Sequence, residues 1–405
     1  MNKHFDIAVI GGGAGGLFFT ALASDTHKNK SFALIEKNQR VGKKLLVTGN
    51  GRCNLTNIYA NKNNYHGSFA DFMENQLSVC PPEKVLELFL KMGLVTRADD
   101  YGRVYPKSNQ ASSVLDVLRF NCDKENVNFF CENQVTKIDK CKNKFIITTD
   151  KETITCDKLV IATGGAAAPK AGGDKSGYEL IKTLGHTIVK PTPALCPVSV
   201  KSEHLKSLKG IRVQGEVSLI TDGNTKAEEK GEIQFTESAL SGICVFNLSQ
   251  YVKKSQKYIL RISLLPENSY NEVLDILNNN KQVFSKFEAE NLLTGIFHKR
   301  LAQALMKSSN IPLNKKVFDI TDKEIKKLAH IINNFDFEVT GLSDFNNAQV
   351  TKGGVKGNEI DYTTMESKKT KGLYIIGEAL DCNGDCGGYN LQFAFATGYI
   401  AAKEL

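Results

Sequence analysis

Glycine residues near the N-terminus are spaced in the pattern that binds the pyrophosphate of a nucleotide. They form the segment Gly-Gly-Gly-Ala-Gly-Gly at residues 11–16, which follows an apolar run and precedes a predicted helix from Leu17 to Ala23. In this pattern Gly11 permits a tight turn, Gly13 lets the backbone approach a phosphate, and Gly16 lets the helix pack closely on the strand. The free N–H groups at the start of the helix favour negative charge. The spacing therefore predicts a dinucleotide-binding turn.

An acidic residue lies where the ribose of such a nucleotide is expected. Glu36 closes the apolar run from Ser31 to Ile35 and follows the last glycine of the turn by about 20 positions, the usual separation. A carboxylate there accepts hydrogen bonds from ribose hydroxyls and disfavours a 2′-phosphate. NADP is therefore an unsuitable occupant of this site.

A second strand-and-glycine pattern stands late in the chain. Residues 373–378, Leu-Tyr-Ile-Ile-Gly-Glu, are followed by Gly-Gly-Tyr-Asn-Leu-Gln at 387–392 and by a predicted helix from about Leu391 to Lys403. Asn390 is a good N-cap residue for that helix. The positive end of the helix dipole would stabilise negative charge near the N1/C2 carbonyl of a reduced flavin. A cofactor held from both ends of the chain is long, and FAD is the long nucleotide that fits.

Two further segments place polar and glycine residues beside the expected cofactor. A buried strand starting at Lys158 ends in Thr163-Gly164-Gly165, and ligands of open α/β sheets lie beyond the carboxyl ends of the strands. The loop from Thr48 to Asn57 reads Thr-Gly-Asn-Gly-Arg-Cys-Asn-Leu-Thr-Asn. Its backbone donors and the Arg52 guanidinium suit an anionic or electron-rich ligand. A solvated turn is the alternative for this loop.

The residues expected to act on substrate come from the same loops. Arg52 would tune the flavin, and Tyr389 or Cys53 would donate a proton. Glu378 and Asp381 would bind ribityl or ribose hydroxyls. The expected cofactor contacts are the glycine turns with their polar, acidic and basic neighbours: Gly11, Gly13, Ala14, Gly16, Glu36, Lys37, Lys44, Gly51, Arg52, Asn54, Thr163, Gly164, Gly377, Glu378, Asp381, Gly388, Asn390 and Leu391.

The cysteines and histidines form no metal or redox motif in the sequence. Cys382 and Cys386 are separated by three residues rather than the two of a redox-active CxxC pair, and Gly384 stands between them. A redox pair is the less favoured interpretation of these two residues. The seven histidines lie far apart in sequence, and we expect no metal site.

Composition describes an ordinary globular protein. The chain has 405 residues, enough for two or three domains. The net charge of +8 permits a nucleic-acid partner without demanding one. The ten cysteines are scattered without CxxC spacing, which indicates reduced thiols and a cytoplasmic protein. The glycine turn accounts for the apolar stretch near the N-terminus, so neither a signal peptide nor a membrane partner is expected.

The pattern of elements changes along the chain. Residues 1–190 have an α/β pattern, and the proline-rich segment Pro191 to Pro197 marks a border. Val198 to Ile220 and Tyr258 to Leu264 alternate like antiparallel strands, and residues 271–333 have a helical pattern. We therefore expect a discontinuous cofactor domain (1–190 plus 340–405), an inserted β-rich domain (191–270) and a helical part of the insertion (271–339).

These segments together resemble the YhiN/BaiN-like family of bacterial FAD proteins, also described as aminoacetone-oxidase-like. The resemblance spans nearly the whole chain and rests on matching order and spacing of residues 11–16, 42–57, 163–165, 177–178, 184–186, 193–195, 235–236, 240–242, 353–355 and 372–392. It implies a two-dinucleotide-binding-domain flavoprotein: an α/β, Rossmann-like FAD domain with an inserted β-barrel-like domain and a helical subdomain. It also implies an FAD contact at the backbone of Val135.

Members of that family are linked to different reactions: reduction of unsaturated steroid acids, oxidation of aminoketones and formation of dihydrouridine in ribosomal RNA. The resemblance implies an FAD-dependent oxidoreductase with hydride transfer at flavin N5. We favour a reductase that uses NAD(P)H. Because no second dinucleotide motif follows a strand, this donor would bind only transiently. Its substrate would be a small unsaturated molecule or a uracil base in ribosomal RNA. The alternatives are an FAD-dependent amine or aminoketone oxidase and a flavin-bearing RNA-binding or assembly protein without turnover.

Overall fold

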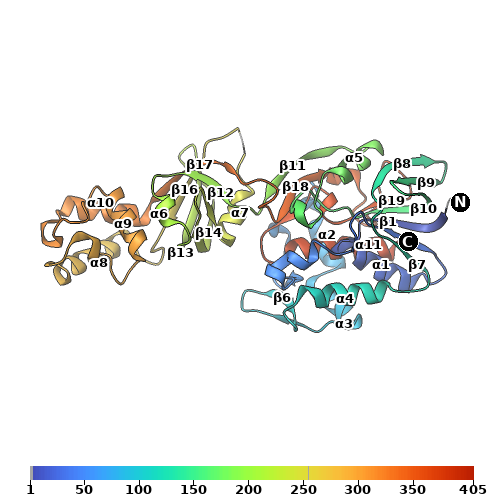
Figure 1. Cartoon of the computed structure of the whole chain (residues 1–405), viewed down its shortest axis with the longest axis horizontal. Coiled ribbons are helices and arrows are strands. Elements are labelled where there is room, and N and C mark those ends of the chain that lie inside the picture. The colour runs from blue at the N-terminus through green and yellow to red at the C-terminus, as the bar shows by residue number, and fades with distance from the viewer. Residues whose placement is uncertain (1–2, 254) are drawn as a thin grey trace. The chain divides into compact units, whose positions relative to one another are not determined.

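The chain divides into two compact units, each seen in Figure 1. One contains Met1–Pro193 and Ala348–Leu405, and the other contains Ala194–Asn347. The computed structural model describes residues 3–253 and 255–405, so residues 1–2 and 254 of the expected domains lie outside the described part. The first unit is thus assembled from two separate stretches of chain, and the second is inserted between them.

The first unit is built around a seven-stranded mixed sheet of order β7-β2-β1-β10-β9-β8, with β19 also paired to β10. Its strands are β1 (Lys3–Ile10), β2 (Phe32–Ile35), β7 (Val127–Phe130), β8 (Val135–Cys141), β9 (Lys144–Thr149), β10 (Thr153–Ile161) and β19 (Leu373–Ile375). β1 runs parallel to β2 and β10, with Ile10 opposite Ile35 and Ile161. Parallel strands are covered on both faces, so they are apolar almost without interruption. Because β1, β2 and β10 run in the same direction, their carboxyl ends share one edge of the sheet.

Helix α1 (Ala14–Thr26) packs against α11 (Tyr389–Lys403) and α4 (Ala111–Cys122), as Figure 1 shows. The ring centroids of Phe18 and Phe395 are 4.9 Å apart, and both side chains are fully buried. Full burial of such a side chain contributes about 1.5–3 kcal/mol. This packing fixes the helix that starts at the first glycine turn against the helix that follows the last one.

Smaller elements surround the sheet of the first unit. Its other helices are α2 (Met73–Val79), α3 (Pro82–Lys91) and α5 (Ser176–Thr183), and short 3-10 turns cover Leu45–Gly51, Lys62–Asn64, Ala70–Phe72, Pro169–Ala171, Gly357–Glu359 and Gly377–Ala379. Its other strands are β3 (Thr56–Asn57), β4 (Tyr65–His66), β5 (Thr96–Ala98), β6 (Arg103–Pro106), β11 (Ile188–Ala194), β18 (Val350–Val355) and β20 (Asn383–Gly384). β20 pairs with β4, and β3, β6 and β5 form a sheet of their own.

The second unit contains a closed barrel of order β12-β15-β14-β13-β16-β17. Its strands are β12 (Val198–Lys201), β13 (Arg212–Thr221), β14 (Asn224–Phe235), β15 (Ala239–Ser241), β16 (Ile259–Ser263) and β17 (Phe335–Leu342). The unit's helices are α6 (Leu205–Leu208), α7 (Ile243–Ser249), α8 (Tyr270–Val283), α9 (Lys299–Ser308) and α10 (Asp322–Asn333), with 3-10 turns at Ala289–Asn291 and Val317–Asp319. Within this unit α8, α9 and α10 gather at one end of the barrel (Figure 1).

The barrel region differs in detail from the alternation in the sequence. The predicted strand from Val198 to Ile220 is interrupted, because α6 lies between β12 and β13. In the helical part, Ser269 and Thr321 form capping boxes that start α8 and α10. Each box pairs the cap hydroxyl with the third residue of its helix, which satisfies two backbone donors at once.

Candidate functional site

The first glycine turn has one open position between two crowded ones. Gly11 has a φ of 106°, and a Cβ there would lie 2.4 Å from the carbonyl oxygen of Ala162. A Cβ on Gly16 would lie 2.0 Å from the carbonyl oxygen of Gly11, whereas one on Gly13 would meet no atom within 4 Å. Gly11 and Gly16 are therefore needed for the turn itself. Gly13 borders open space at the N-terminus of α1, where a phosphate group fits.

Glu36 is held against this turn. Its side chain is buried, Oε2 accepts the backbone N–H of Gly12 at 2.9 Å, and Oε1 accepts that of Asn38 at 2.8 Å. The N–H of Asn133 donates to the Glu36 carbonyl at 3.0 Å, which brings the start of β8 at Val135 close to the same point. A carboxylate has about four acceptor positions, so Glu36 retains capacity for a ribose hydroxyl.

Lys44 and Glu378 come together from distant parts of the sequence. Their Nζ and Oε2 atoms are 2.7 Å apart, and Oε1 of Glu378 accepts the N–H of Thr351 at 2.8 Å. A Cβ on Gly164 would lie 3.8 Å from Oε2 of Glu378. The glycine turn after β10 is thus beside this ion pair, which joins the Lys44 segment to the late segment of the chain.

The other predicted contact residues have varied surroundings. Lys37 forms an ion pair with Asp174. Ala14 begins α1, and Leu391 lies in the first turn of α11. Gly377 has a φ of 65°, and its N–H donates to the buried hydroxyl of Thr397 at 3.0 Å. The charge of Lys37 is thus paired with that of Asp174, and the other three positions carry no charged side chain.

The loop after Lys44 is strongly turned. Gly49, Asn50, Gly51 and Cys53 all have positive φ values, between 55° and 79°. The exposed Arg52 guanidinium lies 4.8 Å from the centre of the Tyr105 ring, and its Nε donates to the Gly49 carbonyl at 3.2 Å. A cation over an aromatic face is held by about 0.5–1 kcal/mol at exposed sites. Arg52 is therefore loosely tethered, and no carboxylate pairs with it in the described residues.

Cys53 does not suit the proton-donor role predicted for it. Its side chain is fully buried, and burial raises the pKa of its thiol to about 12. A thiol without solvent contact and with such a pKa is a poor acid near neutral pH and has no route for reprotonation. These properties weigh against Cys53 as the proton donor, and its role stays a prediction.

The N-terminus of α11 is formed differently from the expectation. The helix begins at Tyr389, and its N-cap is Gly388, with a φ of 108° and no side-chain cap. Asn390 instead binds the preceding loop, because its Oδ1 accepts the Gly384 N–H at 2.8 Å and its Nδ2 donates to the Gly384 carbonyl at 2.9 Å. The prediction of Asn390 as an N-cap was wrong. The positive end of the α11 dipole therefore lies at Gly388 without a side-chain cap.

Asp381 also has a structural contact that the sequence did not predict. It is 4% exposed, and its Oδ2 accepts the N–H of Ser68 at 2.9 Å. Its carbonyl accepts the N–H of Phe69 at 3.0 Å. Asp381 therefore anchors the loop before α2, and burial limits its access to a cofactor hydroxyl.

Two of the predicted residues carry buried polar atoms without a hydrogen-bond partner in the described part of the chain. These are Oγ1 of Thr163 and Oδ1 of Asn54. Unpaired buried polar atoms are uncommon and require an explanation such as a missing ligand or water. Both residues belong to the turns predicted to face the cofactor, so these two oxygen atoms could form hydrogen bonds with a bound polar group.

A histidine–carboxylate pair close to the last glycine turn was missed by sequence reasoning. Nε2 of His66 is 2.9 Å from Oδ1 of Asp385, and Nδ2 of Asn64 donates to Oδ2 of Asp385 at 3.2 Å. Pairing of β4 with β20, in which Asn383 stands opposite His66, holds the two segments together. The partners are 319 residues apart, so no local sequence signal identifies them.

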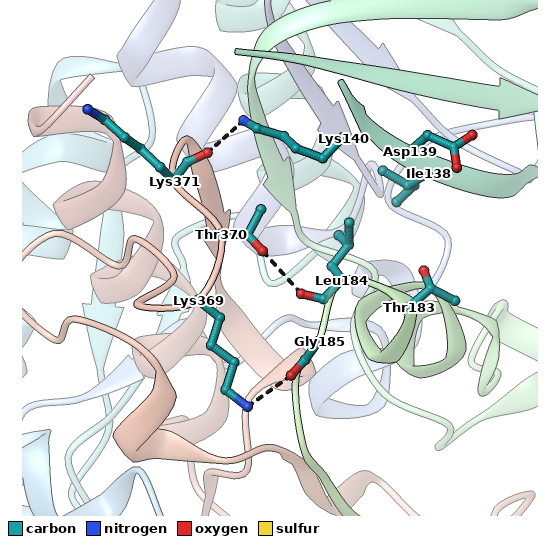
Figure 2. A pocket seen from close by; sticks show the side chains of 9 residues that line it. All are labelled: Ile138, Asp139, Lys140, Thr183, Leu184, Gly185, Lys369, Thr370 and Lys371. Atoms are coloured by element: carbon teal, nitrogen blue, oxygen red, sulfur yellow. Dashed lines mark hydrogen bonds between the residues drawn. The ribbon is translucent and has the colours of Figure 1, made fainter. Parts of the chain in front are cut away.

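A cavity of about 520 Å³ in the same unit is lined by Lys140, Lys369 and Lys371 among others. Figure 2 shows hydrogen bonds between some of the lining residues: Lys140 donates to the Lys371 carbonyl at 2.7 Å, and Lys369 donates to the Gly185 carbonyl at 2.9 Å. Thr370 likewise donates to the Leu184 carbonyl. These contacts join the loops that line the cavity, and of its three lysines Lys369 also forms an ion pair with Glu359 at 2.7 Å.

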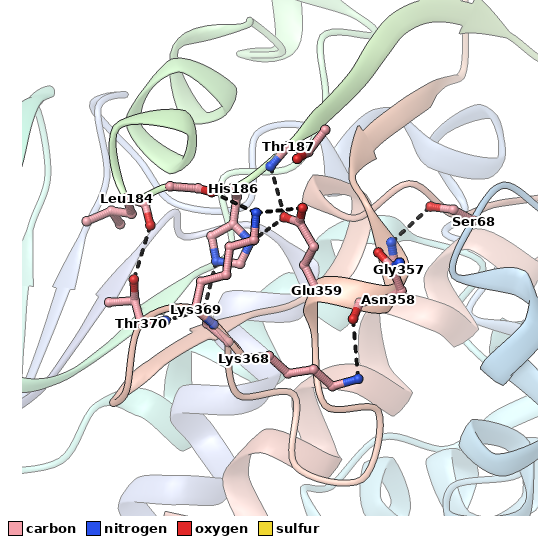
Figure 3. Close-up of polar contacts among 12 residues, drawn as sticks. Ser68, Leu184, His186, Thr187, Gly357, Asn358, Glu359, Lys368, Lys369 and Thr370 are labelled. Atoms are coloured by element: carbon pink, nitrogen blue, oxygen red, sulfur yellow. Dashed lines mark hydrogen bonds and ion pairs between the residues drawn. The ribbon is translucent and has the colours of Figure 1, made fainter.

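The buried His186 follows Gly185 of the cavity lining in the sequence (Figure 3). Its Nδ1 is 3.0 Å from Oε2 of Glu359, and its Nε2 is 2.8 Å from Oγ of Ser367. The order Ser-His-Glu resembles a hydrolase triad, but Oγ of Ser367 already accepts the N–H groups of Lys369 and Thr370 and is 6% exposed. A nucleophile needs access to substrate. We therefore interpret these residues as a structural network.

Comparison with known proteins agrees with this geometry. Residues 5–404 match the family described as HI0933-like protein Rossmann domain. The chain is 34% identical to a 3-dehydro-bile acid delta(4,6)-reductase of Clostridium scindens, over 100% of this chain and 98% of that protein. It is 30% identical to a ribosomal RNA dihydrouridine synthase of Escherichia coli, with coverage of 100% and 98%.

The fold also has a counterpart among solved structures. A variant of the FrdA chain of E. coli quinol fumarate reductase aligns with a TM-score of 0.50 at 14% identity, covering 100% of this chain and 70% of that one. Likeness at this identity concerns the fold alone. Among residues 3–253 and 255–405, every helix is too short or too polar to cross a membrane.

Proposed function

The chain belongs to the HI0933-like Rossmann-domain family and is an FAD-dependent oxidoreductase, and from that premise we propose that it reduces a carbon–carbon double bond with NAD(P)H as transient hydride donor. The two relatives support this reaction class, since their names describe a bile acid reductase and a dihydrouridine synthase. Both names imply addition of hydrogen across a double bond. We further propose that the first unit binds the cofactor.

The observation that carries the FAD assignment is the open position at Gly13 between the crowded Gly11 and Gly16. The N–H groups at the start of α1 would bind the pyrophosphate, and Glu36 would accept from the adenosine ribose. The unpaired Oγ1 of Thr163 supplies a further polar contact on the same side. These residues fit a dinucleotide of the length of FAD.

When bound, FAD supplies a two-electron centre that takes up and releases hydride at its N5 atom. The chain orients this centre and sets its electrostatics. The N-terminus of α11, which has no side-chain cap, would stabilise negative charge on the reduced ring. Arg52, with no carboxylate partner in the described residues, would add positive charge from the opposite loop.

We propose a small unsaturated molecule as the first substrate class, because the relative at 34% identity is a bile acid reductase. A uracil base of ribosomal RNA is the second candidate. It is favoured by the net charge of +8 and by the relative named as a ribosomal RNA dihydrouridine synthase. An RNA substrate predicts that binding weakens steeply as salt rises, whereas binding of a small molecule changes little.

The first test is the absorbance spectrum of the purified protein, followed by anaerobic titration with NADH and NADPH. The proposal expects flavin bands that bleach with one donor and recover when a 3-oxo-4,6-diene steroid acid or uridine-containing ribosomal RNA is added. Bleaching by an amine or aminoketone, with no response to either nicotinamide, would indicate an oxidase instead. Bleaching without recovery by either acceptor would contradict the proposed substrate classes.

A further inference from the structure

The His66–Asp385 pair stands beside the loop that leads into α11. The ring of Tyr65, the neighbour of His66, packs edge-on against the ring of Tyr389 at 6.2 Å between centroids. Asn57 donates to the carbonyl of Gly387 at 3.2 Å and holds the same loop from the other side. The pair is therefore fixed to the segment whose glycine residues begin α11, the helix that faces the flavin in the proposed function.

The two side chains are placed for proton exchange. They are 21% and 20% exposed, so they are neither sealed in the core nor free on the surface. Asp385 is itself oriented, because its Oδ2 accepts from Asn64 and its N–H donates to the Asn64 carbonyl at 2.9 Å. A carboxylate held in this way fixes an imidazole and balances the charge it carries while it holds a proton.

Cys53 and His186 lack these properties, whereas Tyr389 at the start of α11 stays the predicted alternative proton donor. Cys53 is fully buried, and burial raises the pKa of its thiol to about 12. His186 lies in the structural network with Glu359 and is 3% exposed. Among the described residues, His66 thus combines partial exposure, an oriented carboxylate partner and a position next to the α11 loop.

We propose that His66, oriented by Asp385, delivers the proton that completes reduction of the acceptor double bond; this rests on the proposed function. In that reaction the π bond breaks and two C–H bonds form. One carbon receives a hydride with two electrons from the reduced flavin, which NAD(P)H has reduced beforehand. The other carbon receives a proton from the His66 imidazolium, which becomes neutral and takes a new proton from water. Asp385 remains ionised throughout and acts as a positioning residue.

The two half-reactions separate this role from cofactor binding. In His66→Gln, bleaching of the flavin by NAD(P)H should match that of the native protein, because hydride uptake needs no proton from His66. Reoxidation of the reduced protein by a 3-oxo-4,6-diene steroid acid should slow by about 10²–10⁴-fold, the usual effect of losing a general acid. Reoxidation by ferricyanide, which takes electrons without forming a C–H bond, should be unchanged. The exposed His330 provides the matched control His330→Gln, which should behave as the native protein.

Two further measurements test the role of His66, the first by chemical rescue and the second by labelling, which needs no turnover. Free imidazole should restore part of the reoxidation rate of His66→Ala but not that of Asp385→Asn, which still has His66. In the native protein, diethyl pyrocarbonate should label His66 but not His186, as read by mass spectrometry, and the bound acceptor should protect His66.

The outcomes of these measurements are distinguishable. The proposed role of His66 would be overturned by native rates of acceptor reduction in His66→Gln. Labelling of His66 that the acceptor does not affect would also overturn it. Equal loss of the ferricyanide and acceptor rates would also overturn it, since the defect would then lie in the cofactor site. If the native protein reduces neither proposed acceptor, the proposed function is refuted, and the proposed role of His66 is refuted with it.

Discussion

Replacing Gly13 by serine should separate cofactor binding from folding. Gly13 is the N-cap of α1, with φ −83° and ψ −167°, an extended conformation that serine adopts without strain. Serine is a better N-cap than glycine by a few tenths of a kcal/mol, and its Cβ would meet no protein atom within 4 Å. We therefore expect the apoprotein to be as stable as the native one, or slightly more stable.

FAD binding should respond in the opposite direction. The added side chain would occupy the space where a phosphate approaches the backbone. Loss of one hydrogen bond to a charged group costs about 1.5–3 kcal/mol, which weakens binding about 10- to 150-fold. Flavin fluorescence titration of the apoprotein measures the dissociation constant, and urea unfolding measures stability.

Gly16→Ala is the matched control for Gly13→Ser. Its Cβ would lie 2.0 Å from the Gly11 carbonyl oxygen, so it should lower the free energy of unfolding by about 1–3 kcal/mol through overpacking. Unchanged FAD affinity in Gly13→Ser would refute the placement of the pyrophosphate at this turn. Equal destabilisation of the two variants would refute the reading of Gly13 as an open position.

Three other predictions concern residues away from that turn. Although burial raises it, the hydrogen bonds from Lys369 and Thr187 lower the pKa of Glu359 from 4.5 to about 2. The ionised carboxylate therefore adds up to about 3 kcal/mol to the free energy of unfolding, which is present above pH 4.5 and lost as pH falls towards 2. In urea unfolding, Glu359→Gln should lose less stability between pH 7 and pH 3 than the native protein does. Cys53→Ala should lower stability by about 1 kcal/mol and leave turnover unchanged, and a large fall in turnover would restore Cys53 as a candidate acid. Lys44→Met should leave Glu378 without its ammonium partner and weaken FAD retention on gel filtration, whereas the surface variant Lys43→Met should not.

The local geometry that the sequence predicted depends on short-range spacing. The glycine turn at 11–16 and the acid at Glu36 lie within one strand–helix–strand unit, so their geometry follows from local chain stereochemistry. The Rossmann-like sheet and the closed barrel are also confirmed in outline. Hydrophobic alternation and turn residues predicted an α/β domain with a β-rich insertion, and the family resemblance implied that the insertion is a barrel.

The parts that were missed depend on partners far away in the sequence. Asparagine is a residue type favoured at an N-cap, but the side-chain amide of Asn390 forms hydrogen bonds with the backbone N–H and carbonyl of Gly384 instead. Asp381 was expected to bind ribityl or ribose hydroxyls, and nothing in the sequence indicated that its carboxylate accepts the N–H of Ser68 in the interior. The His66–Asp385 pair depends on β4 meeting β20, and neither two-residue strand has a pattern of its own. Long-range pairing of such short strands cannot be derived from periodicity.

The discontinuous first unit has a consequence for the order in which the protein is completed during synthesis. Residues 159–161 of β10 pair with β19, which the ribosome makes only after the whole insertion Ala194–Asn347. At roughly 5–20 residues per second, the nascent chain carries this unpaired sheet edge for roughly ten seconds or more. An exposed edge of apolar strand is a site of aggregation. The inserted unit, by contrast, is complete in one continuous stretch and has time to fold first. Chaperone demand should therefore concentrate on the interval before β19 and α11 arrive, and the cofactor site is the last part of the molecule to be finished.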